Sequence, residues 1–139
     1  MKYYEPKHFT PQEYVPPEIY KELGDKSILL IDDRVLKTDD AIREFFGCAV
    51  IINNWHQGGN RVYSGFRPEY CRVGAKWSQH KFGRASDKMI PTIDITIVRR
   101  AIIDNPKNFP YITVIEDDVS WLHTDCRCVA ASDIHIIKP

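Results

Sequence analysis

The sequence predicts an α+β domain, in which one mainly antiparallel sheet is flanked by helices. The first observation is an amphipathic helical pattern in the first third of the chain, over residues 33–46. The second is that short β-branched segments with strand alternation gather in the last third. The third is a lone helical segment, 91–106, between them. With 139 residues and 43% hydrophobic content, the chain can build one core, so residues 1–139 are expected to form a single domain.

Helices are expected to dominate the N-terminal part. Residues 10–13, Thr-Pro-Gln-Glu, form a capping box with proline at the first helical position, so a short helix should begin there. Pro17 opens a second short helix, which should stop near Gly24. The periodic segment 33–46 predicts the main helix, which Gly47 should end.

Strands should follow the main helix. The expected strands are CAVIINNW (48–55), RASDKMI (84–90), two within 111–126 around an Asp117-Asp118 turn, and DIHIIK (133–138). Segment 91–106 has prolines at both ends and Thr92 as a possible N-cap, so it is expected to be a helix.

A long segment without periodicity, 53–80, is rich in Gly and Asn. A loop of this length inside a compact domain is usually functional. Residues 61–88 carry seven basic side chains against two acidic ones, while residues 1–47 lean acidic. This basic segment favours an anionic ligand, either a carboxylate or a phosphate; the alternative is a solvated charged loop. The seven are Arg61, Arg67, Arg72, Lys76, Lys81, Arg84 and Lys88.

Several classes of function are disfavoured. The net charge of zero argues against a nucleic-acid partner, and no run approaches the roughly 20 apolar residues of a membrane span. The N-terminus MKYYEPKHFTPQEY lacks the apolar core of a signal peptide, so synthesis in the cytosol with reduced cysteines is expected. Cys126 and Cys128 form a C-x-C pair, but Cys48 and Cys71 make no second pair, which disfavours a four-sulfur zinc site.

Two clusters of polar residues indicate a metal site. In SQHKFGRASD, His80 and Asp87 surround the small residues Gly83 and Ala85. In SWLHTDC, strand alternation would place Trp121, His123 and Asp125 on one face. Two histidines and one aspartate are the ligand count of a catalytic zinc site, whose fourth position is left to water. The alternative is that these histidines are structural. We expect the remaining histidines not to bind the metal: His8, His56 and His135.

These motifs resemble those of a known family. S-x-H-x-x-G-x-A-x-D is similar to the first zinc motif of the D-alanyl-D-alanine metallopeptidases. That group includes zinc D-Ala-D-Ala carboxypeptidases, the vancomycin-resistance dipeptidase and phage L-alanyl-D-glutamate endolysins, and the hedgehog signalling domain shares its fold. W-x-H-x-D resembles the second motif, and YSGFRP the upstream S-G-Y-R segment. The matching residues are Ser78, His80, Gly83, Ala85, Asp87, Trp121, His123, Asp125 and Arg67.

The resemblance implies a hedgehog/DD-peptidase fold and Zn²⁺ held by His80, Asp87 and His123. It places Arg67 where the family binds substrate, and we expect this arginine to carry little of the fold; the alternative is a structural ion pair. Supporting roles are expected for Gly83 in the turn between ligands, for Ser78 in hydrogen bonds that hold the loop, and for Trp121 and Asp125 beside His123.

The implied activity is hydrolysis of peptide bonds in peptidoglycan stem peptides. The protein would then be a phage or prophage lysis enzyme, released to the cell wall by a holin, or a component of a virion. A peptidoglycan peptide is the expected partner, with neither nucleic acid nor membrane, and the protein is expected to be a monomer.

One position departs from the family pattern. Many members have a Glu or Asp general base three residues before the last histidine, where this chain has Ser120. A serine cannot accept a proton from zinc-bound water at neutral pH. Either an acid of the run 116–118 takes this role, or the domain is a catalytically lapsed zinc-containing binding or structural module.

The turn between the last two long strands decides which acid could serve. If Asp117-Asp118 is a two-residue turn, Glu116 pairs with Val119 and shares the face of His123. If the loop is one residue longer, Glu116 pairs with Ser120 and faces away. Because the shorter turn is the commoner connection, Glu116 is the predicted base.

Overall fold

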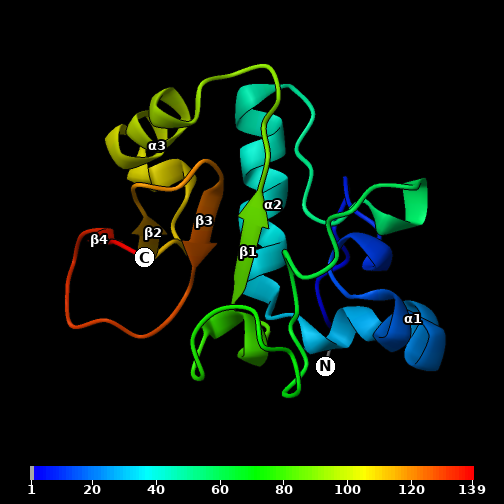
Figure 1. Cartoon of the computed structure of the whole chain (residues 1–139). Helices are drawn as coiled ribbons and strands as arrows, with labels where there is room; N and C mark the ends of the chain where they lie inside the picture. Colours follow the sequence, from blue (N-terminus) through cyan, green and yellow to red (C-terminus); the bar gives the residue numbers. More distant parts are fainter. Residues whose placement is uncertain (1) are drawn as a thin grey trace.

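A four-stranded sheet with one long helix behind it forms the frame of the molecule (Figure 1). In the computed structural model, which describes residues 2–139, the order of strands is β1-β3-β2-β4. The pairs β1–β3 and β3–β2 are antiparallel, whereas β2–β4 is parallel. The predicted α+β class is confirmed, with a mixed sheet. The strands are β1 (Ala85–Lys88), β2 (Val114–Glu116), β3 (Leu122–Asp125) and β4 (His135–Ile137).

The N-terminal helices follow their sequence signals. The capping box is formed, with a single 3₁₀ turn over Pro11–Glu13. Helix α1 (Pro17–Leu23) stops at Gly24 as predicted, although a further 3₁₀ segment, Gly24–Leu30, continues from it. Helix α2 (Asp33–Phe46) has the predicted bounds. The Asp32 carboxylate caps its first turn, and Gly47 ends it in the left-handed conformation.

Two local predictions were wrong. Segment 48–55 is not a strand, because it pairs with the sheet at one point only, the Ile51–Met89 bridge. The next backbone groups bond elsewhere: the Asn53 amide donates to the carbonyl of Glu13 at 3.0 Å. In the helix predicted over 91–106, α3 (Ile95–Asp104), the cap is Asp94 rather than Thr92. The Asp94 side chain accepts from the amide of Thr96.

Within residues 2–139, the structure contains no helix long and apolar enough to cross a bilayer.

The connection between β2 and β3 is longer than predicted. It spans residues 117–121 rather than a two-residue Asp117-Asp118 turn, and Asp118 has a positive φ of 59°. Arg99 of α3 holds this connection, donating to the carbonyls of Val119 at 2.5 Å and Trp121 at 2.8 Å. These bonds attach the connection to α3.

The sheet has one face in the core and one face at a polar cluster. On the core side, Ser86 and Lys88 of β1 point towards α2. Lys88 and Asp39 of α2 are fully buried and form an ion pair of 2.9 Å between Nζ and Oδ1. Lys88 also donates to the hydroxyl of Thr124 at 2.8 Å, and Ser86 donates to Asp39. Since strand side chains alternate, Asp87 points to the opposite face.

Candidate metal centre

Three buried side chains, His80, Asp87 and His123, converge on the outer face of the sheet. His80 lies in the 3₁₀ turn Gln79–Phe82, and Asp87 and His123 are directly opposed on β1 and β3. Their ligand atoms all lie within 4.8 Å of one another. Asp87 Oδ1 is 3.3 Å from His80 Nε2 and 2.8 Å from His123 Nδ1. This group could hold a metal ion.

The backbone fixes the orientation of His80. Its Nδ1–H donates to the carbonyl of Gly65 at 2.7 Å, so its Nε2 presents a lone pair towards Asp87. The Arg67 amide donates to the His80 carbonyl at 3.1 Å, which ties the two loops together. A metal-binding histidine usually donates its other ring N–H to a carbonyl or a carboxylate, as His80 does to Gly65.

A carboxylate fixes the orientation of His123. Its Nε2 lies 3.1 Å from Oδ2 of Asp125, whose side chain is fully buried. Arg127 in turn donates to both oxygens of Asp125, with its Nε at 2.9 and 3.0 Å. In its neutral form, with Nε2–H donating to Asp125, His123 would present the lone pair of Nδ1 to Asp87. The arrangement is the carboxylate–histidine pair that orients metal ligands.

The donor set, two imidazoles and a carboxylate, is of a kind that could hold a metal ion. Bonds of about 2.0–2.2 Å at tetrahedral angles would place ligand atoms roughly 3.3–3.5 Å apart. Here the distance between His80 and Asp87 is 3.3 Å, and the distance between His123 and Asp87 is shorter, 2.8 Å. With both tautomers set by their outer partners, two nitrogen lone pairs face one carboxylate oxygen. That contact is repulsive unless a proton or a cation lies between them. Two imidazoles and a carboxylate leave the fourth position of such a site to water.

Glycine is required at position 83 for two reasons. Gly83 has φ of +66°, and a Cβ built there would meet the carbonyl oxygen of Leu30 at 1.9 Å. Its own carbonyl accepts from the amide of Asp32 at 2.9 Å. The turn between His80 and Asp87 therefore packs directly against the segment that leads into α2.

Burial and charge act in opposite directions on the cluster. Burial alone would raise the pKa of Asp87, but the neighbouring His80 and His123 outweigh it and hold this pKa well below its usual value. Burial lowers the pKa of His80, and Asp87 offsets only part of that effect. Burial also acts to lower the pKa of His123, yet Asp125 and Asp87 together raise it. Asp87 is thus held as a carboxylate.

An open pocket adjoins the cluster. Its volume is about 460 Å³, and its lining includes Asp87, Arg67, Tyr63 and Trp121. Arg67 is buried, donates to the Tyr63 carbonyl at 2.7 Å, and forms a 2.8 Å ion pair with Asp87 Oδ2. It therefore makes the structural ion pair that was the alternative to a purely substrate-binding arginine, while still lining the pocket.

Two supporting residues differ from expectation. Trp121 lies before β3 in the 117–121 connection, so strand alternation does not place it; it reaches the pocket from the loop instead. Ser78 holds its loop through its backbone, accepting from the Lys81 amide at 3.0 Å. None of the hydrogen bonds found among residues 2–139 uses the Ser78 hydroxyl. Ala85 behaves as expected, buried two residues before Asp87.

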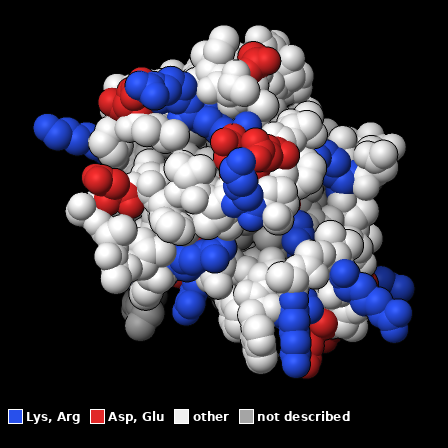
Figure 2. Space-filling model, turned by 60° about the vertical axis from the view of Figure 1, so that its left-hand side comes forward, with Lys and Arg blue, Asp and Glu red and all other residues white. Residues whose placement is uncertain are grey.

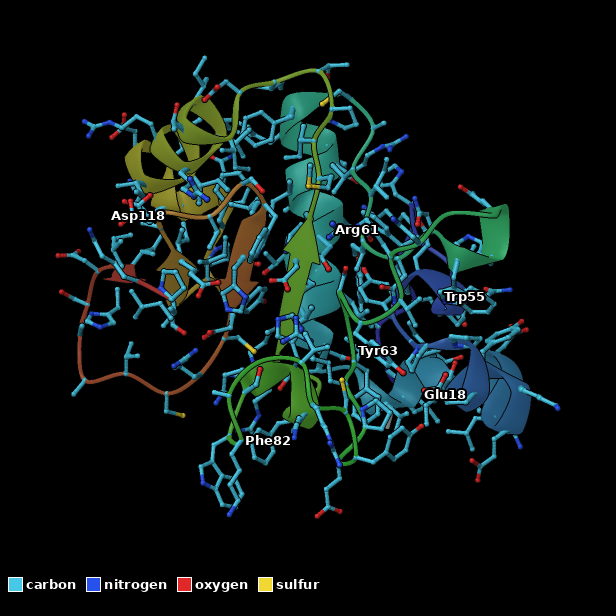
Figure 3. All side chains as sticks on the ribbon, viewed as in Figure 1. Glu18, Trp55, Arg61, Tyr63, Phe82 and Asp118 are labelled. Atoms are coloured by element: carbon cyan, nitrogen blue, oxygen red, sulfur yellow. The ribbon has the colours of Figure 1, made fainter. Side chains whose placement is uncertain are left out.

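The three acids of the 116–118 run have separate positions. Glu116 is paired directly with His123, so both predicted registers were wrong, although Glu116 does share the face of the metal cluster. Asp118 lies on the far side of the sheet from β1, in an ion pair of 2.7 Å with Lys138 (Figure 3). Asp117 lies 3.6 Å from Arg99. Glu116 is the acid of this run closest in register to the cluster.

Arg127 is a functional candidate that the sequence reasoning missed. Arg127 orients Asp125. The pKa of Arg127 is raised, mainly by its hydrogen bond to Asp125 and to a smaller extent by the charge of Glu116. The spacing H-x-D-x-R over residues 123–127 was the available signal, because alternation continues along an extended chain. The carbonyl of Gly65, which orients His80, had no side-chain signal.

No family model, curated protein or solved structure matches this chain. The four cysteines, Cys48, Cys71, Cys126 and Cys128, are free thiols.

Proposed function

We propose that this protein is a zinc metallopeptidase that hydrolyses peptide bonds in peptidoglycan stem peptides, with a hedgehog/DD-peptidase fold. The observation that carries the proposal is the convergence of His80, Asp87 and His123, with ligand atoms within 4.8 Å and both histidines oriented by outer hydrogen bonds. The resemblance of SQHKFGRASD and WLHTD to the family's zinc motifs supplies the substrate class. On this proposal the protein is a phage or prophage lysis enzyme or a virion component.

His80, Asp87 and His123 would hold the zinc ion. Zinc bound there would lower the pKa of a coordinated water towards about 7 and polarise the scissile carbonyl. Glu116, opposite His123 in the sheet, is the candidate general base. It would take a proton from the attacking water and pass it to the amine that leaves when the C–N bond breaks.

Two side chains beside the cluster would position the substrate. Arg67 lines the pocket and, besides its bonds to Asp87 and Tyr63, presents a guanidinium to the pocket. It would hold a substrate carboxylate or the carbonyl oxygen as negative charge develops. Trp121 lines the same pocket and would offer its ring to an apolar part of the substrate. The positive charge of the 61–88 segment suits stem peptides, which carry free carboxylates.

The second candidate is a zinc-containing module that has lost hydrolysis. Ser120 stands where many family members have the acid, and this favours the second candidate. The register of Glu116 favours the first candidate. Glu116 lies directly opposite His123, and the Cβ atoms of residues paired in this way are about 4.5–5.5 Å apart. The two candidates share the metal site and differ in turnover.

Metal analysis and digestion of peptidoglycan separate the possibilities. The purified chain is analysed for zinc, then incubated with peptidoglycan, and the products are read by mass spectrometry. Zinc near one per chain with new stem-peptide termini supports the peptidase. Zinc without new termini selects the lapsed module. A chain that takes up no zinc contradicts both, and leaves the histidines with a structural role.

A further inference from the structure

An exposed aromatic groove is formed by the segment that carries His80. Trp77 and Phe82 are 71% and 48% exposed, which is unusual for side chains of this size in a small domain. Together with Glu69, Lys76 and Lys81 they line a groove of about 350 Å³, here called the Trp77 groove. Phe82 projects from the loop below β1 in Figure 3. The volume falls within the range of about 300–1,000 Å³ typical of sites for small organic ligands.

The Trp77 groove belongs to the same segment as a metal ligand. Phe82 is the last residue of the 3₁₀ turn Gln79–Phe82 that carries His80, and Trp77 lies three residues before His80. The segment is tied down, because the Lys81 ammonium donates to the carbonyl of Glu69 at 3.1 Å. The Trp77 groove and the metal centre are thus held by one short segment of the chain.

The chemistry of the Trp77 groove suits a sugar. The flat faces of an indole and a phenyl ring pack against the C–H faces of a pyranose, while ammonium groups donate to its hydroxyl, acetamido and carboxylate oxygens. The Lys76 ammonium lies 5.3 Å from the centre of the Trp77 ring. With Lys81 there are two lysines against Glu69, so the groove is positively charged. Figure 2 shows blue side chains, with red ones beside them, at the lower end of the molecule, where Figure 1 places this loop.

We infer that the Trp77 groove binds the glycan strand of peptidoglycan while a stem peptide of the same strand occupies the metal centre. The inference rests on the proposed function, since it names the part of that substrate which the metal centre does not hold. Stem peptides are joined covalently to the sugars, so a peptide at His80 brings its sugar close to the same loop. The charge of the groove complements the carboxylates that peptidoglycan carries. A concave groove also fits a chain of rings better than it fits a flat bilayer.

The test measures binding, not cleavage. Glycan strands freed of their stem peptides are titrated against the full chain by calorimetry, and the same is done with the Trp77→Ala variant. Each stacked ring is worth a factor of about 5–150 by analogy with aromatic stacking on bases, so binding should weaken about fivefold or more. Ile97→Ala is the matched control, because Ile97 is 61% exposed but lies on α3. It should bind like the parent.

Further measurements test other classes of partner and separate failure of the inference from failure of the proposed function. Anionic vesicles and single-stranded DNA should bind weakly, with no dependence on Trp77. Equal affinity of parent and Trp77→Ala for the glycan, no glycan binding, or Trp77-dependent binding to vesicles or DNA alone would each overturn the inference. Zinc content and hydrolysis of a free stem peptide are measured in parallel and should not change in Trp77→Ala. If the parent lacks zinc and turnover yet binds glycan through Trp77, the proposed function fails and the groove assignment stands.

Discussion

Removal of Lys88 from its buried ion pair with Asp39 should cause a large loss of stability, which a second substitution at Asp39 should recover. Both side chains are fully buried, 2.9 Å apart, and Lys88 has Ser86 and Thr124 as further acceptors. Lys88→Met keeps the length of the stem but leaves the Asp39 carboxylate without its cation. Breaking one side of a buried pair costs about 3–5 kcal/mol. For a domain of this size, with about 3–4 °C per kcal/mol, the melting temperature should fall by about 10–20 °C.

The double variant Lys88→Met/Asp39→Leu is the decisive comparison. Replacing both members of a buried pair by apolar side chains is often neutral or stabilising, so the double variant should recover most of the loss. Thermal and denaturant unfolding measure the effect. Arg100→Met is the control, because the Arg100–Asp104 pair is exposed and should be worth under about 1 kcal/mol. A Lys88→Met protein as stable as the parent, or a double variant no better than the single one, would refute the reasoning.

Three further predictions concern the metal centre. His80→Ala should abolish zinc retention, because it removes one of three protein ligands; full occupancy by elemental analysis would contradict the ligand set. Arg67→Lys should keep zinc near one per chain but lower kcat/KM by about 10²-fold, the scale of losing one oriented donor at a developing oxyanion. Turnover equal to that of the parent, with only a lower Tm, would leave Arg67 a purely structural role. Glu116→Gln should retain zinc and lose hydrolysis by about 10²–10⁴-fold, the usual worth of a general base, while Asp118→Asn stays close to the parent. An active Glu116→Gln enzyme would show that another group accepts the proton.

The sequence alone determined the elements whose signals are local. A periodic apolar face and a terminal glycine place α2 at Asp33–Phe46, because each depends on residues within a few positions. Position 83 was likewise readable as a turn, since glycine adopts a positive φ. The three candidate ligands were also predicted, because residue type and motif spacing carry that information.

Only the tertiary structure decided what depends on partners far along the chain. The strand expected over 48–55 does not form, because the amide of Asn53 donates to the carbonyl of Glu13 and not to the sheet. The β2–β3 connection spans residues 117–121, and Arg99, from another element, holds it by donating to the carbonyls of Val119 and Trp121.

The same reason explains the surroundings of the ligands. The carbonyl of Gly65 orients His80 across 15 positions of sequence, and the ion pair of Lys88 with Asp39 spans a still longer stretch. Neither contact leaves a local pattern, because a carbonyl is common to all residues and a lone lysine in a strand usually lies in solvent. Local propensity therefore sets the ends of helices, whereas long-range hydrogen bonds and ion pairs set the register of the strands and the orientation of the ligands.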